Sequence, residues 1–231
     1  TAYLPLGEWQ RIDNVDLMAC VTFSALNVIE TLYYFKTGIR RNFSDRFTAK
    51  MSGTTSQGNY LYLVADSIRK DGLVDETDWP VPDDTTWDSY YQEIPQLIKD
   101  KAKKFLDSWT IQYEFIDVTR ESLLYHLKQS PIQVVIPGHA VMNFYTSESI
   151  YKFFDSYEPF IKERTDGFIT ALKYVMTKKQ TMKFIINAKG DQYIFPNPLL
   201  KVAIGIADVA ELEEFKKHGL QEPLVSGEVP D

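Results

Sequence analysis

The chain has 231 residues, which is enough for one large domain or two small ones with a substantial core. Its formal net charge of −7, with no basic stripe to offset it, argues against a general nucleic-acid binder. No apolar run approaches the roughly 20 residues of a transmembrane helix, and the single cysteine excludes an internal disulfide.

The most informative early segment is a predicted helix that begins at the only cysteine. Residues 1–19 contain proline, glycine and polar residues with little periodicity, so we expect an extended arm that wraps the domain. A helix is predicted from about residue 20 to 36, with its apolar face at three- and four-residue steps: Ala25, Ile29, Leu32 and Tyr33. Cys20 then lies in the first turn, where unpaired N–H groups and the helix dipole stabilise a thiolate. The alternative is an unreactive buried cysteine, which is the usual role of a single thiol.

The middle of the chain predicts helices followed by strands. Further helices are expected over residues 61–70 and 95–109, and the polar, proline-containing stretch between them is expected to form a surface loop over residues 81–94. Residues 111–118 alternate as a strand, and Thr119 can cap a short helix to Leu127. A second strand, residues 131–136, leads into Pro137-Gly138, which has the composition of a type II turn.

The next two predicted strands carry a histidine at the start of the first and an aspartate directly after the second. His139 opens a predicted strand over residues 139–145, and a strand over residues 150–154 ends directly before Asp155. A histidine in an apolar strand is by default a core or edge residue, so this position alone decides nothing. The predicted elements that follow are a helix over 165–176, strands over 182–187, 192–195 and 201–206, and a helix that begins at Asp208.

Three local motifs together resemble the papain-like cysteine peptidases. Cys20-Val21-Thr22-Phe23-Ser24-Ala25 is similar to the family signature Cys-Trp-Ala-Phe-Ser-Ala, with Val21 and Thr22 as the departures. His139-Ala140-Val141 at a strand start resembles the way the family presents its catalytic base, and the spacing to Asp155 resembles that to the family's asparagine. The resemblance covers about residues 9–160 and is to a disulfide-free, phage- or bacterium-like member.

The resemblance implies a fold of the α+β class. We expect an N-terminal helical half around a long central helix that starts at Cys20, and a C-terminal half formed by an antiparallel sheet or barrel that carries His139 and Asp155. A single peptidase domain is expected over residues 1–218. Its expected parts are a helical lobe over about 15–108, a β-rich lobe over about 110–206 and a C-terminal helix over 208–218, before a tail over 219–231.

The resemblance also implies a role for each site residue. Cys20 is the expected nucleophile, His139 the base, and Asp155 the residue that orients the imidazole. The backbone N–H of Cys20 and the amide of Asn14, which stands where the family has a glutamine, form the expected oxyanion hole; a solvated turn residue is the alternative for Asn14. Tyr157 replaces a tryptophan that shields the triad. The expected substrate-binding residues are Gln57, Gly58, Tyr60, Val135 and Ala140.

The implied function is hydrolysis of peptide bonds through a Cys-His-Asp triad and a thioester intermediate, with a peptide or protein as substrate and no metal or other cofactor. Two alternatives stay open: a catalytically idle domain that serves as a structural or binding module, and a cell-wall peptide hydrolase or transpeptidase. The start at Thr1 without a signal peptide leads us to expect a processed product or a part of a larger chain or assembly. A reducing compartment or a phage particle would suit a chain without disulfides, and no membrane partner is expected.

Overall fold

The computed structural model describes residues 2–179, 183–186, 192–197 and 202–206. They fall into two compact units, Thr1–Thr177 and Lys178–Asp231. None of the helices in these ranges is long and apolar enough to cross a bilayer.

The first unit is organised around α1 (Cys20–Thr37), which begins at the predicted residue. It ends at Gly38, whose φ of 71° is the left-handed conformation that glycine adopts at a helix C-terminus. All residues from Val21 to Leu32 are buried, so the helix is enclosed on every side. The other helices of this half are α2 (Asp45–Met51), α3 (Leu61–Asp71) and α5 (Gln96–Ser108), and α1 packs against α2 and α3.

The other half of the first unit is a sheet of six strands in the order β3-β8-β4-β5-β6-β7. These strands are β3 (Trp109–Ile116), β4 (Ile132–Ile136), β5 (His139–Thr146), β6 (Tyr151–Phe154), β7 (Ile161–Arg164) and β8 (Thr170–Lys178). The pairs from β8 through β7 are antiparallel. A short helix, α6 (Arg120–His126), is capped by Thr119 as predicted.

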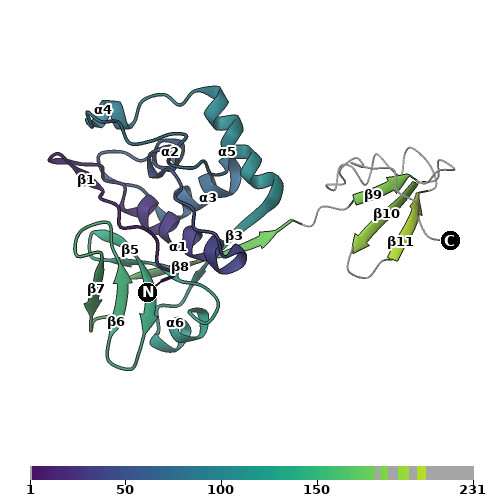
Figure 1. Ribbon diagram of the computed structural model, residues 1–231. Helices are drawn as coiled ribbons and strands as arrows, with labels where there is room; N and C mark the ends of the chain where they lie inside the picture. The colour runs from purple at the N-terminus through teal and green to yellow at the C-terminus, as the bar shows by residue number, and fades with distance from the viewer. Residues whose placement is uncertain (1, 180–182, 187–191, 198–201, 207–231) are drawn as a thin grey trace. The chain divides into compact units, whose positions relative to one another are not determined.

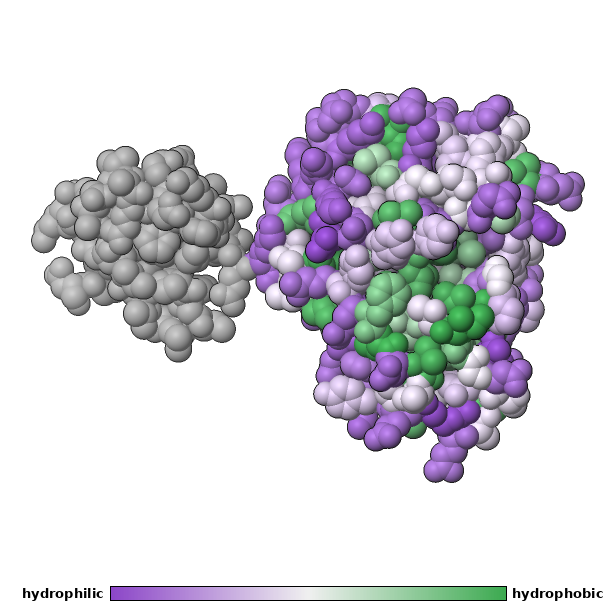
Figure 2. All heavy atoms as spheres, turned by 180° about the vertical axis from the view of Figure 1, so that it is seen from behind, coloured by the Kyte–Doolittle hydropathy of each residue, from purple (hydrophilic) through white to green (hydrophobic). Residues whose placement is uncertain are grey.

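Helix α1 lies between the other helices and the sheet (Figure 1). It contacts β4 and β5, and the largest cluster of buried apolar residues joins α1, α3 and the sheet. On the face shown in Figure 2, apolar residues gather in the middle of the first unit, with hydrophilic residues around them.

The hairpin between β4 and β5 places His139. Ile136 pairs with His139 across the turn, so only Pro137 and Gly138 connect the two strands. Gly138 has a φ of 72°, which agrees with the predicted turn composition. Because β4 and β5 pack on α1, the start of β5 is held beside the helical half.

Two predicted elements are wrong. The helix expected over residues 165–176 is strand β8 instead. It lies between β3 and β4, and Ala171 to Tyr174 are buried without alternation. A strand covered on both faces has a continuous apolar pattern, which periodicity cannot separate from a buried helix.

The surface loop expected over residues 81–94 contains a short helix, α4 (Trp87–Tyr90), and Tyr90 is fully buried. The buried guanidinium of Arg46 on α2 holds this segment through the carbonyl oxygens of Pro80, Ser89 and Tyr90. A long-range contact of this kind orders a segment whose own composition is typical of a loop.

The N-terminal arm includes a small hairpin of β1 (Arg11–Ile12) and β2 (Val15–Asp16). Asp13 and Asn14 form its turn with φ values of 47° and 70°. Positive φ at both central residues is the requirement of a type I′ turn, which asparagine and aspartate tolerate.

The second unit contains the three strands predicted near the C-terminus: β9 (Lys183–Ile186), β10 (Gln192–Asn197) and β11 (Val202–Ile206). They form an antiparallel sheet of their own in the order β11-β10-β9. The C-terminal boundary of the papain-like domain, expected at residue 218, stays a prediction. The expected helix over 208–218 and the tail over 219–231 lie outside the described residues.

Candidate active site

A cavity of about 570 Å³ in the first unit brings together most of the predicted site residues. Those that line it are Cys20, Gln57, Gly58, Tyr60, Val135, His139, Ala140 and Tyr157. They come from the start of α1, the loop before α3, the β4–β5 hairpin and the segment between β6 and β7, which are far apart in the sequence. Two predicted residues do not line it: Asp155 is buried behind His139, and Asn14 lies in the exposed turn between β1 and β2.

Cys20 is partly buried at the N-terminus of α1. The preceding residue, Ala19, offers no side chain to cap the helix, and the first turn contains no acidic residue. The positive end of the helix dipole is therefore not neutralised by a side chain of its own first turn. Cys20 therefore lies where unpaired backbone N–H groups and the helix dipole point at its side chain.

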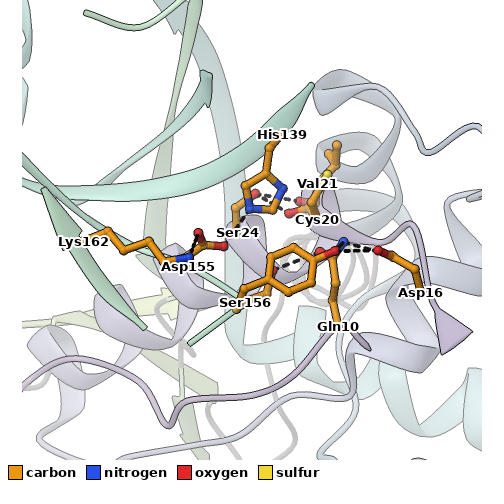
Figure 3. A network of polar contacts seen from close by, with 10 residues as sticks. Gln10, Asp16, Cys20, Val21, Ser24, His139, Asp155, Ser156 and Lys162 are labelled. Atoms are coloured by element: carbon orange, nitrogen blue, oxygen red, sulfur yellow. Dashed lines mark hydrogen bonds and ion pairs between the residues drawn. The ribbon is translucent and has the colours of Figure 1, made fainter. Parts of the chain in front are cut away.

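His139 is bound on one side of its ring and faces Cys20 on the other. Its Nε2 lies 2.6 Å from Oδ1 of Asp155, which leaves Nδ1 for the thiol. Figure 3 shows the imidazole between Asp155 and the first turn of α1. Burial lowers the pKa of His139, but hydrogen bonds with Asp155 and Cys20 and the negative charge of both raise it to about 9. The imidazolium is thus the favoured form at neutral pH.

Asp155 is a buried carboxylate with two cationic partners. Its side chain is 4% exposed, and Nζ of Lys162 on β7 lies 2.7 Å from Oδ2. Burial raises the pKa of Asp155, but hydrogen bonds to His139 and Lys162 hold it below its ordinary value. Lys162 has no local motif in the sequence. It lies seven residues after Asp155, on the strand that follows β6.

A buried glutamine fixes the first turn of α1 against the sheet. Nε2 of Gln133 on β4 donates to the carbonyl oxygen of Val21 at 2.7 Å and to Oγ of Ser24 at 2.8 Å. The hydroxyl of Ser24 in turn donates to the carbonyl oxygen of Cys20 at 2.7 Å. Gln133 thus links the strand that leads to His139 with the turn that carries Cys20. Its role is not evident from the sequence, because a glutamine in an apolar strand has no local signature.

The structure does not bring Asn14 to the cavity, but another amide of the arm lines it. Gln10 is buried there, and its Nε2 donates to the hydroxyl oxygen of Tyr157 at 2.6 Å and to Oδ1 of Asp16 at 3.2 Å. The hydroxyl of Tyr157 donates to Oδ2 of Asp16 at 2.7 Å. The β1–β2 hairpin inserts between Gln10 and Cys20, so counting back from the cysteine leads to the hairpin turn instead of the cavity.

Tyr157 covers one side of the His139–Asp155 pair. Its ring centroid lies 5.4 Å from that of the imidazole. This position is compatible with the shielding role expected for it, because an aromatic ring there excludes water from a buried hydrogen bond.

The wall of the cavity beside Cys20 is largely apolar. Val135, Ala140 and Phe115 contribute to it, and Tyr60 forms an exposed part of the wall. Gly58 has a φ of 86°, a conformation that strains any residue with a Cβ. Within the described ranges, no group of three or more His, Cys, Asp or Glu side chains is placed to hold a metal ion.

No family model and no curated protein sequence matches the chain. Among solved structures it is similar to the bromelain protease from Ananas comosus in complex with the E64 inhibitor, with a TM-score of 0.59 at 15% identity over 75% of this chain and 94% of that one. It is also similar to digestive procathepsin L 3 of the Tenebrio molitor larval midgut, with a TM-score of 0.55 at 13% identity over 75% and 67%. A third likeness is to the Carica candamarcensis cysteine protease CMS1MS2 in complex with E-64, with a TM-score of 0.51 at 12% identity over 68% and 88%.

The organisms named are neither phages nor bacteria, so these likenesses give no support to the expected origin. At this level of identity they show the fold. The chain has the α+β papain-like fold, with its long helix starting at Cys20 and with His139 and Asp155 on its antiparallel sheet.

Proposed function

We propose that this protein is a cysteine peptidase that hydrolyses peptide bonds through Cys20, His139 and Asp155. The observation that carries the proposal is the 2.6 Å contact between His139 and Asp155 beside a cysteine at a helix N-terminus, at one cavity. A nucleophile, a base and a group that orients the base are the parts that acyl transfer requires.

The reaction begins with transfer of the thiol proton from Cys20 to Nδ1 of His139, which gives a thiolate and an imidazolium. The thiolate attacks the carbonyl carbon of the peptide bond, and the backbone N–H of Cys20 stabilises the resulting oxyanion. His139 then gives its proton to the leaving amine as the C–N bond breaks, and a thioester remains. Water, deprotonated by His139, attacks the thioester, and the acid product leaves with Cys20 restored.

Asn14 has no part in this scheme, because the hairpin turn keeps it out of the cavity. Gln10 lines the cavity, but both N–H groups of its amide are used by Asp16 and Tyr157. Of the two expected oxyanion donors, the Asn14 amide and the backbone N–H of Cys20, the proposal therefore keeps only the N–H of Cys20.

The proposed binding mode uses the backbone near Gly58 and an apolar pocket. A substrate strand would pair with main-chain groups of Gln57 and Gly58, as peptides do with exposed strand edges. Tyr60, Val135 and Ala140 would then contact the second side chain before the cleaved bond. Burial of an apolar side chain there contributes about 1.5–3 kcal/mol, so we expect selectivity for such residues.

The leaving-group side is expected to be open, since Pro137 and Gly138 alone connect β4 to His139. In the papain-like family a long excursion walls that side. Bulky or cross-linked leaving groups should therefore be accepted. This feature favours a cell-wall peptide hydrolase as the second candidate function.

The test is turnover of a peptide library varied on both sides of the cleaved bond, together with a cross-linked cell-wall peptide. The proposal predicts hydrolysis by the native protein, none by Cys20→Ala, and unchanged hydrolysis by Ser149→Ala, a matched small substitution at an exposed turn position that does not line the cavity. Preference should be sharp for the second residue before the bond and weak after it. Binding of peptides without any hydrolysis would contradict the proposal and favour the idle binding module.

A further inference from the structure

The carboxylate of Asp155 has two partners, and only one of them belongs to the proposed triad. Oδ1 contacts Nε2 of His139 at 2.6 Å, while Nζ of Lys162 lies 2.7 Å from Oδ2. The side chain of Lys162 is 27% exposed and that of Asp155 only 4%, so the ammonium reaches the carboxylate from nearer the solvent. Each oxygen thus has its own partner: one cation of fixed charge and one group that gains and loses a proton.

The β6–β7 hairpin builds this pair locally. Phe154 pairs with Ile161, and the backbone N–H of Asp155 donates to the carbonyl oxygen of Phe160 at 2.8 Å. Lys162 is the next residue on β7 after Ile161, and it reaches Asp155 diagonally across the hairpin. The pair is therefore fixed by strand register and needs neither the helical half nor a substrate.

We propose that Lys162 is a positioning residue that keeps Asp155 ionised and in place in both charge states of His139. The proposal rests on the proposed function for its consequence in turnover. While His139 is an imidazolium, both oxygens of Asp155 face a cation. After His139 has given its proton to the leaving amine, the imidazole is neutral and Lys162 is the cation that remains. Without Lys162, the buried carboxylate would be left uncompensated in that half of the cycle.

The same ammonium limits how strongly Asp155 retains the proton on His139. A lysine cation offsets part of the negative field that the carboxylate exerts on the imidazole. Asp155 paired with Lys162 can then orient the imidazole of His139 and still allow its proton to pass to the leaving amine. A carboxylate with no counter-ion would hold the imidazolium more tightly and slow that transfer.

The remaining charged and titratable neighbours do not replace Lys162. Cys20 on α1 faces the other side of the imidazole, and Tyr157 lies over both groups, with its ring centroid 6.0 Å from Nζ of Lys162. Asp16 accepts the hydroxyl proton of Tyr157. The adjacent acidic residue on β7, Glu163, pairs with Lys152 on β6 at 2.7 Å, and successive residues of a strand point to opposite faces.

The test follows the imidazole of His139 by NMR as a function of pH in the intact protein. Lys162→Met removes the charge and keeps the length of the side chain, so the proton affinity of His139 should rise roughly tenfold. Lys162→Arg keeps the charge and should keep the native titration. Lys152→Met is the matched control, because it removes the neighbouring ion pair on the same hairpin, and it should leave His139 unchanged.

In turnover, the alkaline loss of activity should move to higher pH in Lys162→Met and return to its native position in Lys162→Arg. A titration of His139 in Lys162→Met that matches the native protein, or lies below it, would overturn the proposal. The titration is read without any substrate. Failure of the native protein to cleave peptides would therefore count against the proposed function only. The titration of His139 would still decide the role of Lys162.

Discussion

At the scale of single residues, the sequence could reveal those functional groups that carry a local motif. Cys20 stands at the start of a periodic apolar run, and His139 opens a strand directly after a proline-glycine turn. Lys162 and Gln133 act across strands, so their roles depend on register and tertiary contact, which composition does not encode. The distance of Asn14 from Cys20 in the sequence does not predict its place in the fold, because the β1–β2 hairpin lies between Gln10 and Cys20 and has Asn14 in its turn.

Asp155→Asn tests the electrostatic part of the site. The proposed thiolate–imidazolium pair needs His139 protonated, so activity should be lost as the pH rises through the pKa of His139, which is about 9. Asp155 raises that pKa by its hydrogen bond and its charge. Asparagine keeps a hydrogen-bond acceptor but removes the charge, so the pKa should fall and the alkaline limb of kcat/KM should move to lower pH.

The control is Asp117→Asn, which removes an exposed carboxylate that does not line the cavity. It should leave the pH profile unchanged. An alkaline limb that stays in place in Asp155→Asn would show that Asp155 does not act on His139.

At the scale of elements, periodicity correctly predicted the start of α1, and the capping residue Thr119 correctly predicted α6. Periodicity failed at β8, because a central strand buried on both faces lacks the alternation that identifies a strand. It also gave no hint of α4, which depends on the buried guanidinium of Arg46. The contact between α1 and β4 through Gln133 could not be predicted either, although it sets the position of Cys20 relative to His139.

Gln133→Leu tests that relation. The leucine cannot donate to Val21 and Ser24, and it leaves the buried hydroxyl of Tyr174 without its acceptor, which lies at 3.0 Å in the native protein. We expect the free energy of unfolding to fall by about 1–3 kcal/mol, measured by denaturant titration. We also expect kcat/KM to fall at a pH and temperature where the variant is fully folded, because Cys20 loses its fixed position relative to His139.

An exposed glutamine, Gln92, provides the matched control. Gln92→Leu should change neither quantity appreciably. Unfolding of Gln133→Leu at the native denaturant concentration, together with native turnover, would contradict the linking role of Gln133.

At the scale of the whole molecule, the features that the proposal needs lie in the first compact unit. The triad residues, the cavity and the described clusters of buried apolar residues all fall within Thr1–Thr177. The sequence predicted the strands of the second unit but not their separation into a sheet of their own, since strand pairing over long distances leaves no local pattern.

A chain that ends after Lys179 tests whether the first unit is sufficient. It retains the whole of β8 and hence every strand of the six-stranded sheet. We expect it to unfold cooperatively and to cleave peptides at the rate of the full chain. An insoluble or inactive fragment, beside an active full chain prepared in the same way, would show that the C-terminal unit completes the site or the fold.

The central claim, that Cys20 and His139 form a nucleophilic pair, is tested most directly by covalent labelling. The native protein and His139→Ala are treated at about pH 6.5 with an epoxide that alkylates thiolates, and the adducts are located by mass analysis of the digested chain. The account predicts a single fast adduct on Cys20 in the native protein and slow or absent labelling in His139→Ala. Equal labelling rates in the two proteins, or no adduct on Cys20 in the native one, would contradict it.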